Sequence, residues 1–114
     1  MTCWRGEKPE CKAKWIVCDE NLVEGAQDFL DVYSQLSVDN VNVRMVNDGE
    51  LVRYAYINSK GAGFVLEIDP GIMDPDCLGP IKSALVDKLT QALYGDPRWQ
   101  LLYHIIERQM LPTP

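Results

Sequence analysis

The clearest pattern in the chain is an alternation of apolar and polar residues across residues 40–69. Three runs, 40–46, 51–58 and 64–69, alternate with the period of two that is typical of strands. Asp48-Gly49 separates the first two runs, and residues 59–63 separate the second from the third. Asp-Gly favours a two-residue hairpin turn, because both central positions need a positive φ. The pattern therefore predicts a three-stranded antiparallel meander.

The two turns also predict the register of the meander. A turn at residues 48–49 pairs Val43 with Tyr54, and a turn centred on Gly61 pairs Tyr56 with Leu66. Both registers bring apolar side chains to one face of the sheet, namely Val41, Val43, Met45, Val52, Tyr54, Tyr56, Phe64, Leu66 and Ile68. Because they belong to this apolar face, Tyr54 and Tyr56 are interpreted as core residues.

Apolar residues recur at helical spacing on both sides of the meander. Asn21 suits the N-cap of a helix over 19–36, whose apolar stripe consists of Leu22, Ala26, Phe29, Leu30, Tyr33 and Leu36. Pro80 suits the first position of a second helix over 80–94, which Gly95 ends. Asp96-Pro97 then starts a third helix over 97–110.

Together these elements predict an α+β fold with a three- to four-stranded antiparallel sheet. The sheet consists of the meander 40–69 and an additional edge strand at 14–18. Helix 19–36 and a C-terminal helical hairpin, 80–94/97–110, are expected to cover one face of it. Residues 1–13 are polar and contain Gly6 and Pro9, so we expect an irregular N-terminal arm before a single domain over 14–114.

The composition is that of an acidic globular protein. The 114 residues are 46% hydrophobic and include 11 Lys and Arg against 17 Asp and Glu, for a formal net charge of −6. This balance disfavours binding to nucleic acids or anionic membranes, which need clustered basic residues. The first residues lack the pattern of a signal peptide, and no apolar run reaches the length of a membrane span. We therefore expect a cytoplasmic protein.

The acidic residues of segment 19–36 lie opposite its apolar stripe. Glu24, Asp28 and Asp31 share this side of the predicted helix. A charged helix face is usually no more than a solvated face. It is also the most plausible docking surface in this chain for a basic protein partner.

The predicted last helix is apolar over more than one face. One stripe consists of Trp99, Leu102, Tyr103, Ile106 and Met110, and a second begins with Leu101 and Ile105. An apolar arc this wide is either clamped between two elements or partly exposed as an interface. We expect a homodimer, or a docked partner, that uses Trp99, Leu101 and Ile105.

The four cysteines allow several interpretations. Cys3, Cys11, Cys18 and Cys77 could form two disulfides, but only in an oxidising compartment. No Cys-x-x-Cys pair is present, and the spacing does not fit a structural zinc site. In a cytoplasmic protein, Cys18 and Cys77 are expected to be small buried residues, with Cys3 and Cys11 in the N-terminal arm.

Other candidate residues carry no recognisable motif. Asp69, Asp74 and Asp76 could hold a divalent ion, but their spacing is not that of an EF-hand loop. His104 is the only histidine, and no nucleophile elbow or catalytic cysteine signature accompanies it. We therefore assign no catalytic residue, no metal ligand and no cofactor.

Three functional classes remain open. The first is a non-catalytic acidic protein-binding module of the inhibitor, immunity or chaperone/adaptor type. The order of elements is similar to that of bacterial secretion chaperones, which would imply such a role. The alternative is a small-molecule- or metal-binding domain, including a small enzyme, with a pocket between sheet and helices that uses Tyr54, Tyr56, His104, Asp74 or Asp76. The second alternative is a structural subunit of a larger assembly.

Overall fold

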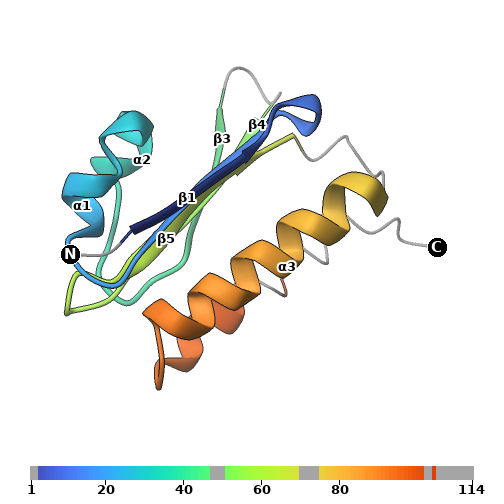
Figure 1. Ribbon diagram of the computed structural model, residues 1–114. Helices are drawn as coiled ribbons and strands as arrows, with labels where there is room; N and C mark the ends of the chain where they lie inside the picture. The colour runs from blue at the N-terminus through green and yellow to red at the C-terminus, as the bar shows by residue number, and fades with distance from the viewer. Residues whose placement is uncertain (1–2, 47–50, 70–74, 102–103, 105–114) are drawn as a thin grey trace.

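A five-stranded antiparallel sheet forms the centre of the molecule (Figure 1). The computed structural model describes residues 3–46, 51–69, 75–101 and 104. The strands are β1 (Cys3–Lys8), β2 (Ala13–Cys18), β3 (Asn42–Val46), β4 (Leu51–Ile57) and β5 (Gly63–Ile68). Their spatial order is β1-β2-β5-β4-β3. The α+β class and the antiparallel meander are confirmed, but the sheet has more strands than expected.

Helices lie on both faces of the sheet, so the prediction of a single covered face was wrong. The long helix α3 (Pro75–Ala92) lies on one face. The other face carries the α1–α2 layer, which consists of α1 (Leu22–Gly25), η2 (Gln27–Phe29) and α2 (Leu30–Tyr33). Two layers are needed because the central strands are apolar on both sides: Ile16, Ala55 and Val65 are buried under the α1–α2 layer.

The N-terminal residues form a strand and not an irregular arm. β1 pairs with β2 along its whole length, and η1 (Pro9–Cys11) joins the two. The segment 14–18 therefore lies inside the sheet, between β1 and β5, and is not an edge strand. Trp4 explains the difference, because this side chain packs against the core under α3 and anchors the strand that carries it.

The register of the meander was right at the first turn and wrong at the second. Val43 pairs with Tyr54 as predicted. Tyr56, however, pairs with Phe64 and not with Leu66. The second turn is tighter than expected because the side-chain oxygen of Asn58 accepts the N–H groups of residues 60 and 62. A shift of two residues leaves every side chain on its predicted face.

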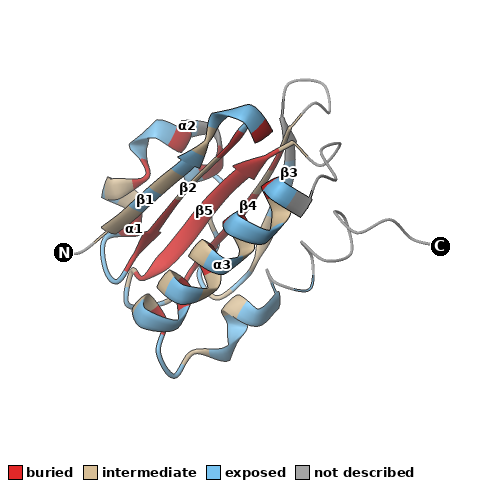
Figure 2. Cartoon of the chain, turned by 45° about the vertical axis from the view of Figure 1, so that its right-hand side comes forward, coloured by how far each residue is buried: buried red, intermediate tan, exposed pale blue. Residues whose placement is uncertain are grey.

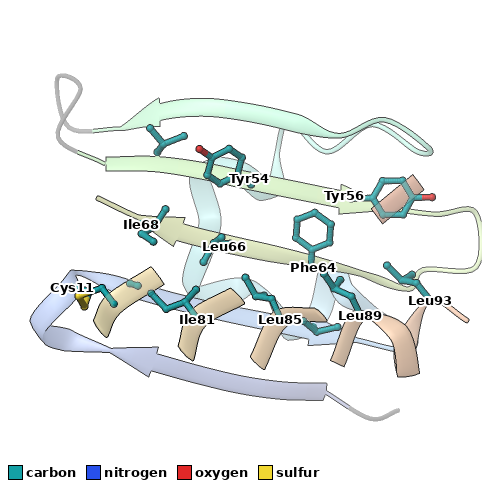
Figure 3. Close-up of a cluster of buried hydrophobic side chains, with 14 of the residues drawn as sticks. Cys11, Tyr54, Tyr56, Phe64, Leu66, Ile68, Ile81, Leu85, Leu89 and Leu93 are labelled. Atoms are coloured by element: carbon teal, nitrogen blue, oxygen red, sulfur yellow. A yellow bond between two sulfur atoms is a disulfide. The ribbon is translucent and has the colours of Figure 1, made fainter. Parts of the chain in front are cut away.

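The main core lies between the sheet and α3 (Figure 3). The side chains that α3 contributes recur every four residues, at Cys77, Ile81, Leu85 and Leu89, and Leu93 directly after the helix continues the row. They face the buried rings of Tyr54, Tyr56 and Phe64 and the side chains of Leu66 and Ile68. α3 begins at Pro75, one turn before the predicted start at residue 80, because burial of Cys77 extends the apolar stripe towards the N-terminus.

The predicted helix over 19–36 is broken into the three short pieces of the α1–α2 layer. Asn21 is the N-cap of α1 as expected, but its side chain makes no capping hydrogen bond and its φ is 52°. The backbone leaves the helical region at Ala26, with φ −96°, and at Phe29, with φ −114°. The break changes which residues are buried: Val32 enters the core, whereas Leu30 and Tyr33 point to solvent.

A disulfide fixes the place of α1 on the sheet. Cys3 in β1 is bonded to Cys18 in β2, and the two are direct partners in the strand register. Gly25 packs on this bond, since a Cβ at that position would lie 3.1 Å from both sulfur atoms. The close approach favours glycine here, and glycine also weakens the helix that the sequence pattern predicted.

The chain after α3 shows the predicted stop and cap, but the predicted helical hairpin 80–94/97–110 is not matched in detail, because α3 spans Pro75–Ala92 and a 3-10 turn follows it. Gly95 adopts a φ of 83° and ends the helical region. Asp96 is the N-cap of η4 (Pro97–Trp99), and its carboxylate accepts the N–H of Arg98 at 3.0 Å. Residues 100, 101 and 104 are helical. The rest of the predicted helix 97–110, including Ile105, lies outside the described residues.

Candidate functional site

The three acidic residues predicted to bind a partner come from three different elements. Glu24 lies in α1, Asp28 in η2 and Asp31 in α2. Glu24 and Asp28 are exposed, whereas the side chain of Asp31 lies outside the described part of the structure. All three belong to the α1–α2 layer, so the predicted acidic face corresponds to one outer layer of the molecule.

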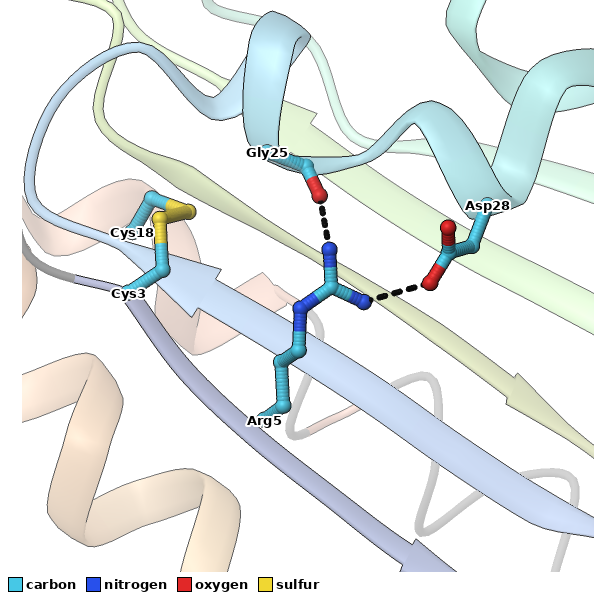
Figure 4. The surroundings of a disulfide bond; sticks show 5 residues. All are labelled: Cys3, Arg5, Cys18, Gly25 and Asp28. Carbon is cyan, nitrogen blue, oxygen red and sulfur yellow. Dashed lines mark hydrogen bonds and ion pairs between the residues drawn. A yellow bond between two sulfur atoms is a disulfide. The ribbon is translucent and has the colours of Figure 1, made fainter.

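One of these acids is already paired with the sheet (Figure 4). The guanidinium of Arg5 in β1 reaches across the layer and binds the carboxylate of Asp28 at 2.7 Å. Arg5 also donates a hydrogen bond to the backbone carbonyl of Gly25. This contact ties the layer to β1, while Glu24 in the layer and Asp19 and Glu20 before it are exposed.

The net charge of the chain is concentrated in this region of the sequence. Residues 15–43 contain six Asp and Glu and no Lys or Arg. The remainder of the chain contains eleven of each kind and is therefore balanced. The sequence interpretation had singled out Glu24, Asp28 and Asp31, but it missed this segregation, which counting charges along the chain would have revealed.

A row of charged side chains crosses the face of the sheet under the α1–α2 layer, with three cations against two acids. Consecutive register partners are Glu7, Lys14, Glu67, Arg53 and Arg44, one from each strand. Glu67 accepts the Nε–H of Arg53 at 2.5 Å, and both side chains are almost fully buried. This acid relieves the repulsion of two arginines on opposite strands. The row therefore contributes little to the net charge that a partner meets.

The α1–α2 layer and the segment after it also expose large apolar side chains. Leu30 is 67% exposed, Tyr33 is 41% exposed and Val38 is 55% exposed. The other exposed large apolar residues of the described chain are Val43 in β3, Tyr94 after α3 and Leu101 after η4. Figure 2 shows the contrast between the buried strand β5 and the exposed outer surface of α2. The most negative part of the chain is thus also its most apolar exposed part.

The predicted interface on the last helix is described only in part. Trp99 is half-buried and packs against the core under α3, whereas Leu101 is 52% exposed. A groove of about 370 Å³ runs beside Trp99 and is lined by Leu93, Tyr94, Pro97 and Gln100 among others. His104 is exposed. The use of this helix in a dimer stays a prediction, because Ile105 and its neighbours lie outside the described residues.

A cluster of polar groups joins the end of α3 to the sheet. The hydroxyl of Tyr56 donates to Asp96 at 2.6 Å, and the Asn58 amide lies 3.4 Å from the same carboxylate oxygen. Arg98 pairs with Asp39 at 3.8 Å and also donates to its backbone carbonyl. A cleft of about 340 Å³ adjoins the cluster. A ligand-binding function would use this cleft, but four of the polar residues that line it already bond in pairs, Arg98 with Asp39 and with Asp96, and Asn58 with Asp96.

Two pKa values in this cluster are shifted. Burial, then the hydrogen bond to Asp96, raises the pKa of Tyr56 above its ordinary value of 10.0. Burial also pushes the pKa of Asp96 upward, but hydrogen bonds from Tyr56, the Arg98 N–H and Asn58 outweigh it, so the net pKa is lowered. A neutral phenol and an ionised carboxylate are therefore the stable pair at neutral pH. This arrangement holds elements together and does not prepare a proton for transfer.

The remaining sequence candidates do not form a catalytic or metal site in the described structure. Tyr54 and Tyr56 are core residues with no exposed surface, as predicted. Asp74 lies outside the described residues, and among those described no three Asp, Glu, His or Cys side chains gather as metal ligands. All four cysteines are paired, Cys3 with Cys18 and Cys11 with Cys77, which corrects their interpretation as separate thiols.

Comparisons with known proteins add no assignment. Protein-family models, curated proteins and solved structures gave no match to this chain. Within the described ranges, none of the helices is both long enough and apolar enough to cross a bilayer.

Proposed function

We propose that this protein is a non-catalytic, disulfide-stabilised binding module whose α1–α2 layer docks a basic protein. The observation that supports the proposal most is the charge segregation: the stretch 15–43 carries the full formal charge of −6, and the rest of the chain is neutral. This stretch includes the whole α1–α2 layer, which is an outer surface of the molecule.

Charge segregation of this kind has a physical use in binding. Exposed charges on opposite partners attract over about 10 Å at 0.1 M salt, so a negative layer orients a basic partner before contact. The acidic layer also repels other acidic proteins, which would be wrong partners. Isolated surface charges contribute little to folding stability. A layer that concentrates them therefore fits recognition better than it fits stabilisation.

The disulfides change the expected location of the protein. Both bonds link segments that the fold brings together, and all four cysteines are used. Disulfides of this structural kind persist in oxidising compartments and are rare in the cytosol. We therefore propose an oxidising compartment in place of the cytoplasm predicted from the sequence, and a partner that shares this compartment.

The test compares two variants, each of which has two acidic residues replaced by neutral amides. Glu24→Gln with Asp31→Asn neutralises the α1–α2 layer, and Asp87→Asn with Glu10→Gln removes the same charge elsewhere. Each tagged protein is used to capture partners from the oxidising compartment of its source. We expect wild type and the second variant to retain a basic protein in equal molar amount, which about 0.5 M salt releases. Equal capture by all three proteins, or no stoichiometric partner, would refute the proposal.

A further inference from the structure

Because the α1–α2 layer is broken, two residues that a continuous helix would bury point to solvent instead. Leu30 and Tyr33 belong to the apolar stripe that the sequence pattern assigns to the core. Because the backbone turns at Ala26 and Phe29, Val32 takes the core position instead. Leu30 and Tyr33 lie one turn apart in α2, where side chains three residues apart are neighbours on the helix surface.

The segment that carries this pair is acidic. Asp28 precedes Leu30 by two residues, and Asp31 lies between the two apolar residues in sequence. Two cations of the sheet reach the layer: Arg5 is held by Asp28 and the Gly25 carbonyl, and Lys14 lies over the ring of Phe29, 4.8 Å from its centre. The stretch from Trp15 to Val43 itself contains no Lys or Arg, so it combines an exposed apolar pair with acids and adds no cation of its own. Its complement is an apolar stripe flanked by positive charges.

We propose that the partner presents a basic amphipathic helix, whose apolar stripe contacts Leu30 and Tyr33 while its Lys and Arg face the acids of the α1–α2 layer. This inference rests on the proposed function and adds the chemistry of the partner segment. Amphipathic helices are a common way to fill such a surface, because residues at i, i+3 and i+4 form one apolar edge between charged flanks. Charge attracts the partner, and the apolar contact retains it.

The experiment uses two synthetic probes with equal charge. One is a Lys/Leu amphipathic peptide of about 18 residues, which is about 27 Å long as a helix. The other is an oligolysine with the same number of lysines and no apolar residues. Both carry a fluorophore, and their dissociation constants are measured by anisotropy at about 50 mM and about 200 mM salt. The folded, disulfide-bonded protein is used throughout.

We expect the amphipathic peptide to bind at least about tenfold more tightly than oligolysine, which corresponds to the burial of one or two apolar side chains. Leu30→Ser with Tyr33→Ser should abolish this difference without changing the salt dependence. Glu24→Gln with Asp31→Asn should weaken both peptides and reduce the salt dependence. Val43→Ser, which removes an exposed apolar residue on another element, is the matched control and should change neither.

Two outcomes separate the inference from the proposed function. If both peptides bind equally and with the same salt dependence, the acidic layer binds basic partners but the apolar contact is wrong. If neither peptide binds, or if Glu24→Gln with Asp31→Asn changes nothing, both the inference and the proposed function fail. A tenfold preference that survives Leu30→Ser with Tyr33→Ser would place the apolar contact elsewhere and would also overturn the inference.

Discussion

The two layers that cover the sheet are built in opposite ways. The α3 layer is one helix of 18 residues that turns an apolar stripe onto the sheet. The α1–α2 layer consists of pieces of four, three and four residues. The first layer is held by a regular row of side chains. The second is held by an irregular set of buried side chains, by the packing of Gly25 on the Cys3–Cys18 bond and by Arg5, the buried set being Leu22, Ala26, Phe29 and Val32.

The difference indicates a division of roles. Helices as short as α1 and α2 have no stability of their own in water, so their position must come from contacts with the sheet. A layer built in this way has no regular apolar stripe to keep, so its apolar and acidic residues can point outward without disrupting one. A continuous amphipathic helix has less freedom, because its period fixes which residues are buried. We therefore interpret the α3 layer as the stabilising side and the α1–α2 layer as the binding side.

Removal of the disulfides should cause the largest loss of folding stability in this comparison. Cys11–Cys77 connects η1 to α3 and closes a loop of 66 residues, whereas Cys3–Cys18 closes one of 15 residues. By the loop-entropy model, replacing both cysteines with Ala should cost about 4 kcal/mol for the first bond and about 3 kcal/mol for the second. Urea unfolding, followed by tryptophan fluorescence under non-reducing conditions, measures both losses.

Each double variant serves as the control for the other. A greater loss for Cys3→Ala with Cys18→Ala would mean that the α1–α2 layer, and not α3, limits the stability of the fold. Alkylation and mass measurement of the wild-type protein taken directly from its source should find no reactive thiol. Four alkylated cysteines would contradict the proposed oxidising compartment and would show that the bonds do not form there.

A pair of matched truncations tests the two layers directly. Leu85 in α3 is 2% exposed and Leu30 in α2 is 67% exposed. Leu85→Ala should reduce the free energy of unfolding by about 3 kcal/mol, because it removes buried methyl groups and leaves a cavity. Leu30→Ala should change it by less than about 0.5 kcal/mol. Equal losses in urea unfolding would mean that Leu30 is a core residue and would remove the basis of the apolar contact.

Much of the fold followed from local signals in the sequence. The turn predicted at Asp48-Gly49 implied the register of Val43 with Tyr54, which the described strands show, and Asp96 is the N-cap of η4 as expected. The register after Gly61 was wrong because the side chain of Asn58 tightens that turn, and a hydrogen bond of this kind has no periodic signature. Local patterns therefore predicted elements and faces better than they predicted the length of a loop.

The errors in the two layers have a common origin in long-range contacts. Cys3 pairs with Cys18 across two strands, and Gly25 packs on the bond directly before the backbone leaves the helical region at Ala26. No spacing in the sequence encodes that contact. For the same reason, the sequence did not predict that Leu30 and Tyr33 are exposed, since periodicity assigned both to the core. The acidic residues of this layer can be named from the sequence, because charge is a property of the residue and not of its packing. Their use in binding stays a prediction.

The smallest expected effect concerns the junction that connects the end of α3 to the sheet. Tyr56→Phe keeps the buried ring but removes the hydroxyl that Asp96 accepts at 2.6 Å. The free energy of unfolding should fall by about 1 kcal/mol at pH 7, the usual net value of one such hydrogen bond. Ser83→Ala on the exposed side of α3 is a control of similar size and should be nearly neutral.

The pH dependence of the same variant distinguishes a hydrogen bond from simple packing. The pKa of Tyr56 is raised in the folded protein, so its contribution is complete below pH 10 and is lost as the pH rises above the pKa of the unfolded tyrosine. Tyr54, whose burial raises its pKa to about 12, contributes in the same direction and remains in the variant.

The pKa of Asp96 is lowered, so its contribution is present at neutral pH and is lost in acid. Stability measured from pH 3 to pH 11 should therefore fall less steeply at both ends in Tyr56→Phe than in wild type. Parallel curves would mean that the hydroxyl of Tyr56 is not bonded to Asp96 and that packing alone holds the end of α3.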